Sequence, residues 1–197
     1  MPSLQDNYNS LTGSVAQSIA LYHHCLSPRA IHTDAAIEAA FLQIQKSWEL
    51  FLEDQLLLIL TGERPTSGTI NAFFNVADVE IARKIVFQEN PYLGWTKFDD
   101  VKTRYSSFMD TPNQVTNSLD AIALDLQEIR TLRNFIAHSS TLARTNFQKL
   151  CTRKLGGNPA IINAASYLFQ SDRGNPGFTY FETYANHIDI CASRMVA

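Results

Sequence analysis

The feature that most constrains the fold of this chain is a long run of apolar residues at helical spacing. Between positions 37 and 59 they recur every three or four residues, at Ile37, Phe41, Ile44, Trp48, Leu52, Leu56 and Ile59. This spacing puts all seven on one face of a helix, which other elements must cover. The sequence therefore predicts a central core helix that begins after a Ser27-Pro28 cap and ends near Thr61-Gly62. Glu49 and Glu53 flank the stripe, either as solvated carboxylates or as partners of an inward-facing arginine.

The rest of the chain has the same helical periodicity. A helix start at Thr111-Pro112, with Gln114 at the reciprocal capping position, predicts one long helix to about Ser140. Other helices are expected at about 4–26, 75–88, 96–109, 142–155, 160–169 and 178–194. We find no strand alternation, internal repeat or dividing linker. The expected fold class is all-α, an up-and-down helical bundle with additional short helices, forming one domain over 1–197.

The composition is that of a globular protein. Its 197 residues suffice for one hydrophobic core, with 45% apolar and 18% charged residues. The three cysteines, Cys25, Cys151 and Cys191, are scattered and odd in number, which predicts free thiols in a reducing compartment. With neither a leader pattern nor a membrane span in the sequence, a cytoplasmic location is expected.

Charge is unevenly distributed along the chain. A net charge of −3 argues mildly against a broad nucleic-acid surface. However, the stretch from Ile129 through Ser171 has no acidic residue and six basic ones: Arg130, Arg133, Arg144, Lys149, Arg153 and Lys154. This stretch carries +6, which leaves −9 for the remainder of the chain. It forms either a basic binding region or a solvated face whose partner charges lie elsewhere.

Arg133 occupies an unusual place on the predicted long helix. At 100° per residue it lies within the arc of Ile122, Leu126, Ile129 and Ile136. An arginine on a core-facing stripe is costly unless it is paired or faces a cleft. It could therefore bridge helices through Glu49 or Glu53, or serve a binding site.

A histidine follows five residues after Arg133. Asn134 and His138 share a helix face, where the amide could hold the imidazole in one tautomer, and Gln127, Arg130, Thr131 and Thr141 extend this polar strip. Arg133 and His138 would lie about 140° apart around a straight helix. One helix would not easily aim both at one atom, whereas a second copy of the chain could complete the site. A histidine at a helix end can also be a favourable charge at the dipole or a core residue.

The segment Arg133-Asn134 with Ala137-His138 resembles the arginine, four-to-six residues, histidine motif of HEPN domains (higher eukaryotes and prokaryotes nucleotide-binding). The earlier Phe41–Leu52 segment is similar to the long early helix of the RiboL-PSP-HEPN branch. The resemblance implies a helical bundle that dimerises with its motifs facing, and a metal-independent endoribonuclease of toxin–antitoxin or phage-defence systems. By the same resemblance, Arg133 and His138 would be catalytic, Asn134 a polar neighbour and Glu49 a supporting acid.

One position departs from that pattern. Toxins of this family that pair with nucleotidyltransferase antitoxins carry a tyrosine two residues after the histidine, where this chain has Ser140. Regulation through such a tyrosine is therefore not expected.

The site residues predict a mechanism without a metal or cofactor, because the sequence lacks a cluster of carboxylates or histidines suited to a metal. His138 would move protons while Arg133 holds the scissile phosphate, and Arg130, Arg144 and Lys149 would bind RNA. Two alternatives stay open: a non-catalytic bundle that binds RNA, nucleotide or a protein partner, and an enzyme acting on a small nucleotide.

Overall fold

The computed structural model describes residues 2–26, 33–67, 70–88, 93–138, 140–156 and 163–197. Within these ranges it is all-α, as predicted, with nine helices and two isolated β-bridges but no strand. The helices are α1 (Leu4–His24), α2 (Thr33–Leu60), α3 (Val79–Phe87), α4 (Phe98–Ser106), α5 (Gln114–Ala121), α6 (Ala123–Ala137), α7 (Thr141–Leu155), α8 (Ala164–Leu168) and α9 (Tyr180–Val196).

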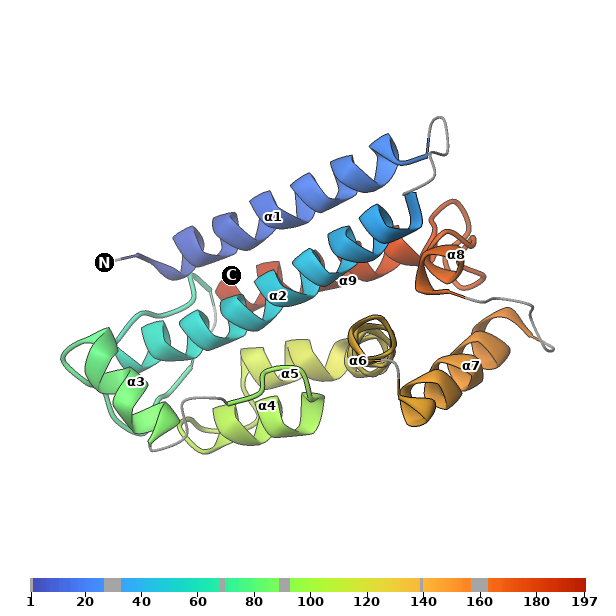
Figure 1. The fold of residues 1–197 in the computed structure, drawn as a ribbon. Helices are drawn as coiled ribbons and strands as arrows, with labels where there is room; N and C mark the ends of the chain where they lie inside the picture. The colour runs from blue at the N-terminus through green and yellow to red at the C-terminus, as the bar shows by residue number, and fades with distance from the viewer. Residues whose placement is uncertain (1, 27–32, 68–69, 89–92, 139, 157–162) are drawn as a thin grey trace.

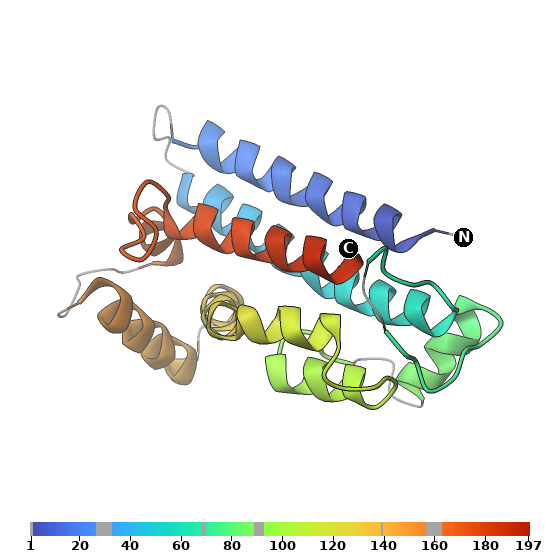
Figure 2. The same ribbon diagram turned by 180° about the vertical axis from the view of Figure 1, so that it is seen from behind.

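The helices α1, α2 and α9 form one layer of the bundle. Figures 1 and 2 show α1 antiparallel to both α2 and α9, with the three packed along their lengths. All seven residues of the predicted stripe on α2 are buried, which confirms it as the central core helix. Its proposed Ser27-Pro28 cap lies outside the described residues. The second set of helices, which carries the candidate site, packs against this layer through α5 and α6.

The second set consists of α4, α5, α6 and α7. In Figures 1 and 2, α6 is seen nearly end-on, so it crosses the first layer steeply, whereas α7 is seen lengthwise and therefore packs across α6. The predicted long helix from Thr111 to Ser140 is wrong, because it breaks into two helices at Ile122 (φ −119°, ψ 20°). No proline or glycine causes this break. The chain turns because α5 packs on α9 whereas α6 packs on α7.

Several helix starts also differ from the predicted ones. The cap of α5 is Asn113, which exchanges side-chain and backbone hydrogen bonds with Thr116, so Pro112 precedes the helix. Asp78 caps α3 by accepting from Ile81 N, and the chain before it is not helical. The expected helix at 160–169 is described only as α8, since 157–162 are outside the described residues.

Two further observations bear on the sequence expectations. The three cysteines are free, with Cys151 and Cys191 buried and Cys25 half-buried. In the described part of the chain, no helix combines the length and apolarity that crossing a membrane requires.

Candidate functional site

The site is built on the corner between α6 and α7. Helix α6 ends at Ala137, because His138 has an extended backbone (φ −133°, ψ 127°) while its amide still donates to Asn134 O at 3.0 Å. Ser140 then caps α7 by accepting a hydrogen bond from Ala143 N at 3.2 Å. Ser140 therefore serves helix initiation, and the exposed His138 side chain lies at a corner of the chain.

Arg133 and His138 meet within a single chain. Arg133 Nη1 lies 3.2 Å from His138 Nε2 and donates to Asn134 Oδ1 at 3.3 Å. A guanidinium can only donate hydrogen bonds, so Nε2 is the acceptor and the imidazole hydrogen lies on Nδ1. The expected 140° separation is wrong, because it assumed that helical geometry continued to His138. The group that contacts the imidazole is Arg133 and not, as predicted, the Asn134 amide.

Arg133 is also less central to the core than the sequence suggested. The buried face of α6 consists of Leu126, Glu128, Ile129 and Leu132. Arg133 is half-buried at the flank of this face, as are Ile122 and Ile136. The cost of placing its charge there is reduced because the residue is only partly buried.

A polar groove of about 590 Å³ opens beside the corner. It lies between the first residues of α4, the outer face of α6 and the start of α7. Arg130, Asn134, His138 and Ser140 line it, together with Gln127, Thr131 and Asn146. The predicted polar strip therefore faces a common groove, with the exception of Thr141, which does not line it. Lys97 and Asp99, which have opposite charges, also line the groove.

The other predicted site residues lie away from this groove. Glu49 accepts hydrogen bonds from Gln45 Nε2 and Thr96 Oγ1, each at 2.9 Å, and Glu53 pairs with Arg83 at 2.5 Å. The contacts of Arg133 are with Asn134 and His138 and not with either carboxylate, so Glu49 does not lie beside it as a supporting acid. Arg144 and Lys149 are exposed on α7 outside the groove lining, and Lys149 lies about 10 Å along the helix axis from Leu142.

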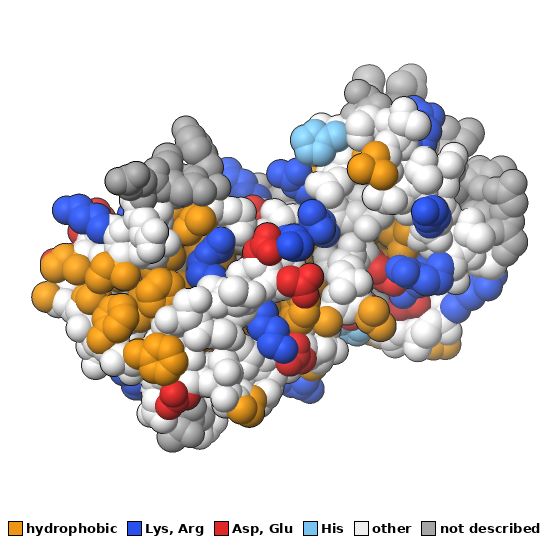
Figure 3. All heavy atoms as spheres, turned by 90° about the horizontal axis from the view of Figure 1, so that it is seen from below, with side chains coloured by type: hydrophobic (Ala, Val, Ile, Leu, Met, Phe, Trp, Pro, Cys, Tyr) orange, Lys and Arg blue, Asp and Glu red, His pale blue; other side chains and the backbone are white. Residues whose placement is uncertain are grey.

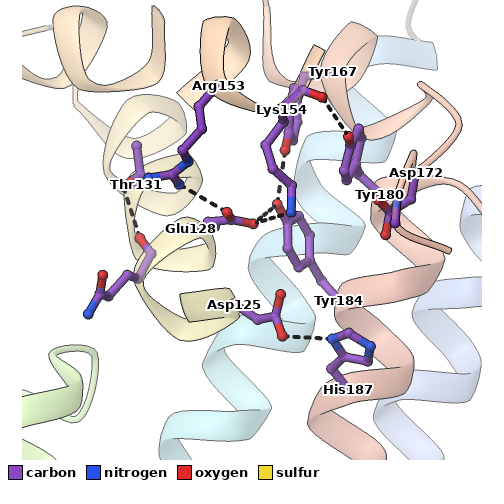
Figure 4. Close-up of polar contacts among 12 residues, drawn as sticks. Asp125, Glu128, Thr131, Arg153, Lys154, Tyr167, Asp172, Tyr180, Tyr184 and His187 are labelled. Atoms are coloured by element: carbon purple, nitrogen blue, oxygen red, sulfur yellow. Dashed lines mark hydrogen bonds and ion pairs between the residues drawn. The ribbon is translucent and has the colours of Figure 1, made fainter. Parts of the chain in front are cut away.

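A buried carboxylate that the sequence reasoning missed joins α6 to α7. Glu128 accepts from Arg153 Nη2 at 2.9 Å, Lys154 Nζ at 3.0 Å and Tyr184 Oη at 2.8 Å (Figure 4). Two of the six basic side chains in the acid-free stretch thus share one carboxylate, which supports in part the interpretation of partner charges elsewhere. The available signal was that Glu128 is the last acidic residue before that stretch.

A second polar pair fixes α6 against α9. His187 Nδ1 lies 2.7 Å from Asp125 Oδ2, and Figure 4 shows the two side chains bridging the helices below Glu128. This hydrogen bond and the negative charge of Asp125 raise the pKa of His187, against the opposing effect of burial. Together, the Glu128 and Asp125 contacts set the position of α6, and with it the position of Arg133.

The surface around the site is mixed in charge. Figure 3 shows lysine and arginine side chains along the middle and right of the lower face, interrupted by acidic ones, with a hydrophobic patch toward the α3 end. Among the described residues, no three or more His, Cys, Asp or Glu side chains are grouped to hold a metal ion.

A guanidinium and an imidazole lie side by side at the corner, and these are groups that can hold an anion and exchange a proton. Comparisons of the chain with models of known protein families, with curated proteins and with solved structures give no match.

Proposed function

We propose that this protein is a metal-independent endoribonuclease with a HEPN-like site, of the toxin or phage-defence type. The observation that carries the proposal is the contact between Arg133 Nη1 and His138 Nε2, because His138 lines a polar groove although Arg133 itself does not. RNA supplies its own nucleophile, the 2′-hydroxyl, so a site with one proton acceptor and one phosphate-binding cation has the groups that strand cleavage needs.

The proposed reaction begins when the scissile phosphate replaces His138 as the hydrogen-bond partner of Arg133. His138 Nε2 is then free to take the proton of the 2′-hydroxyl as its oxygen attacks phosphorus. Arg133 stabilises the negative charge that grows on the phosphoryl oxygens. The bond from phosphorus to the 5′-oxygen breaks, and that oxygen takes a proton from water or from an imidazolium. The products are a 2′,3′-cyclic phosphate and a 5′-hydroxyl.

RNA and a second copy of the chain are the proposed partners. Arg130 would contact the bound strand inside the groove, and Arg144 and Lys149 would contact flanking phosphates outside it. Leu142 lies at the groove and is 71% exposed, so a second copy that covers it would bury apolar area beside the two motifs. A cytoplasmic location and restraint by an antitoxin or defence-system partner belong to the same proposal.

Cleavage of labelled RNA in EDTA tests this function. Wild-type protein should cut the RNA, and His138→Ala should lower the rate by roughly 100-fold or more, as loss of a proton-transfer group does. Arg133→Ala should lose a comparable factor, while both variants keep the wild-type helical circular dichroism. His24→Ala, which removes another exposed histidine, is the matched control and should cut normally. Equal cutting by the His138, Arg133 and wild-type proteins would refute the assignment.

A non-catalytic role is favoured by one observation, the contacts of Arg133 with both Asn134 and His138. These contacts already tie the last turn of α6 to the corner, so Arg133 could serve structure in a bundle that binds RNA, nucleotide or a protein. That function predicts RNA binding without cleavage and a clear fall in the Tm of Arg133→Ala. Offering mononucleotides and RNA as alternative substrates separates both functions from an enzyme that acts on a small nucleotide.

A further inference from the structure

A small internal cavity lies behind the groove. Gln45, Trp48, Trp95, Thr96, Phe98 and Leu126 are among the residues that line it. Phe98 and Leu126 also line the groove, so the two spaces share one wall. The cavity has free space of about 10 Å³, roughly enough for one water molecule.

Two buried polar atoms in the lining residues have no protein partner: the acceptor Gln45 Oε1 and the donor Trp95 Nε1. Each residue is only 4% exposed. The Gln45 amide donates through Nε2 to Glu49, which can only accept, so its oxygen is the atom left over. A buried donor or acceptor without a partner costs about 1–3 kcal/mol, which makes this pair an unusual feature of a packed interior.

The surrounding side chains hold both atoms in place. Glu49 fixes the Gln45 amide and also accepts from Thr96, which lines the same cavity. The Arg104 guanidinium stacks on the Trp95 ring at 4.3 Å from the ring centroid. The residues that line the cavity therefore include one unpartnered acceptor, one unpartnered donor and two indole rings, which are groups that can bind the polar edge and the face of a planar base.

We propose that this cavity, opened by outward rotation of the Phe98 ring, is a binding pocket for a pyrimidine base. Phe98 is half-buried in the shared wall, and its phenyl group is a six-membered ring like that of cytosine or uracil. The space that it vacates therefore matches a pyrimidine better than a two-ring purine. An N–H of the base would donate to Gln45 Oε1, and an adjacent acceptor would receive Trp95 Nε1–H. The inference rests on the proposed function, because the base would belong to a nucleotide of the RNA that is bound in the groove.

Tryptophan fluorescence tests this pocket directly, because the two tryptophans of the chain, Trp48 and Trp95, both line it. The titration uses His138→Ala protein, so that binding is measured without cleavage. CMP and UMP should quench the emission with saturation, at lower concentrations than AMP and GMP, and ribose 5-phosphate should not quench it. Absence of quenching by CMP and UMP, or equal quenching by ribose 5-phosphate, would overturn the proposal.

Substitutions then locate the base. Gln45→Met keeps the side-chain length but removes the acceptor, together with the Nε2 donor to Glu49. CMP and UMP should bind roughly fivefold to tenfold more weakly, as expected for one hydrogen bond lost to the base. The matched control is Gln43→Met, an exposed position on the same helix, which should leave affinity unchanged. Phe98→Ala removes the closing ring and should tighten pyrimidine binding. Equal affinity in the two glutamine variants would place the nucleotide elsewhere.

The outcome is distinguishable from that of the proposed nuclease activity. If wild-type protein cuts RNA but CMP and UMP leave the fluorescence unchanged, the base pocket is wrong and the nuclease assignment stands. If CMP and UMP bind as described but RNA is not cut in EDTA, the pocket stands without the nuclease.

Discussion

Replacing Glu128 with alanine should lower the free energy of unfolding by about 3 kcal/mol. The carboxylate is 5% exposed and accepts from Arg153, Lys154 and Tyr184. Removing one partner of a buried ion pair costs about 3–5 kcal/mol. The lower end applies because the Arg153 side chain is 64% exposed and regains water, which limits its share to about 1 kcal/mol or less. Most of the loss comes from the buried Tyr184 hydroxyl and from Lys154, which is 25% exposed.

Thermal unfolding followed by circular dichroism measures this effect. For a chain of this size, a loss of about 3 kcal/mol lowers the Tm by about 6–12 °C. Arg153→Ala is the matched control, since it removes only the exposed partner and should cost about 1 kcal/mol or less. The reasoning fails if Glu128→Ala leaves the Tm unchanged, or if Arg153→Ala lowers it as much as Glu128→Ala does.

Two further predictions concern the frame around the site. Asn113→Ala removes the side-chain cap of α5 and should cost about 1 kcal/mol in urea unfolding, whereas a wild-type midpoint would contradict the assigned cap. The pKa of His187 is raised by Asp125, so the pair stabilises the fold below the ordinary histidine pKa and loses this contribution as pH rises through the raised value. The stability difference between wild type and His187→Asn should therefore be larger near about pH 5 than near about pH 9, and a difference that grows with pH would refute it.

The sequence by itself determined the fold class and the central helix. Seven apolar residues at helical spacing can be buried together only on one face of a helix, and all seven are buried on α2. It also singled out Arg133, Asn134 and His138 as candidate site residues, but it placed Arg133 and His138 on different sides of a straight helix. Periodicity and local spacing are properties of the amino-acid sequence, so they can be recognised without a tertiary structure.

Only the tertiary structure decided how the site is assembled. The break at Ile122 and the extended backbone of His138 carry no proline or glycine signal, and they depend on how α5, α6 and α7 pack on different neighbours. The extended His138 is what brings its imidazole to Arg133. Likewise, Glu128 selects Arg153 and Lys154 as partners across 25 and 26 positions of sequence. Such contacts form between elements, and no local pattern encodes which helix faces will meet.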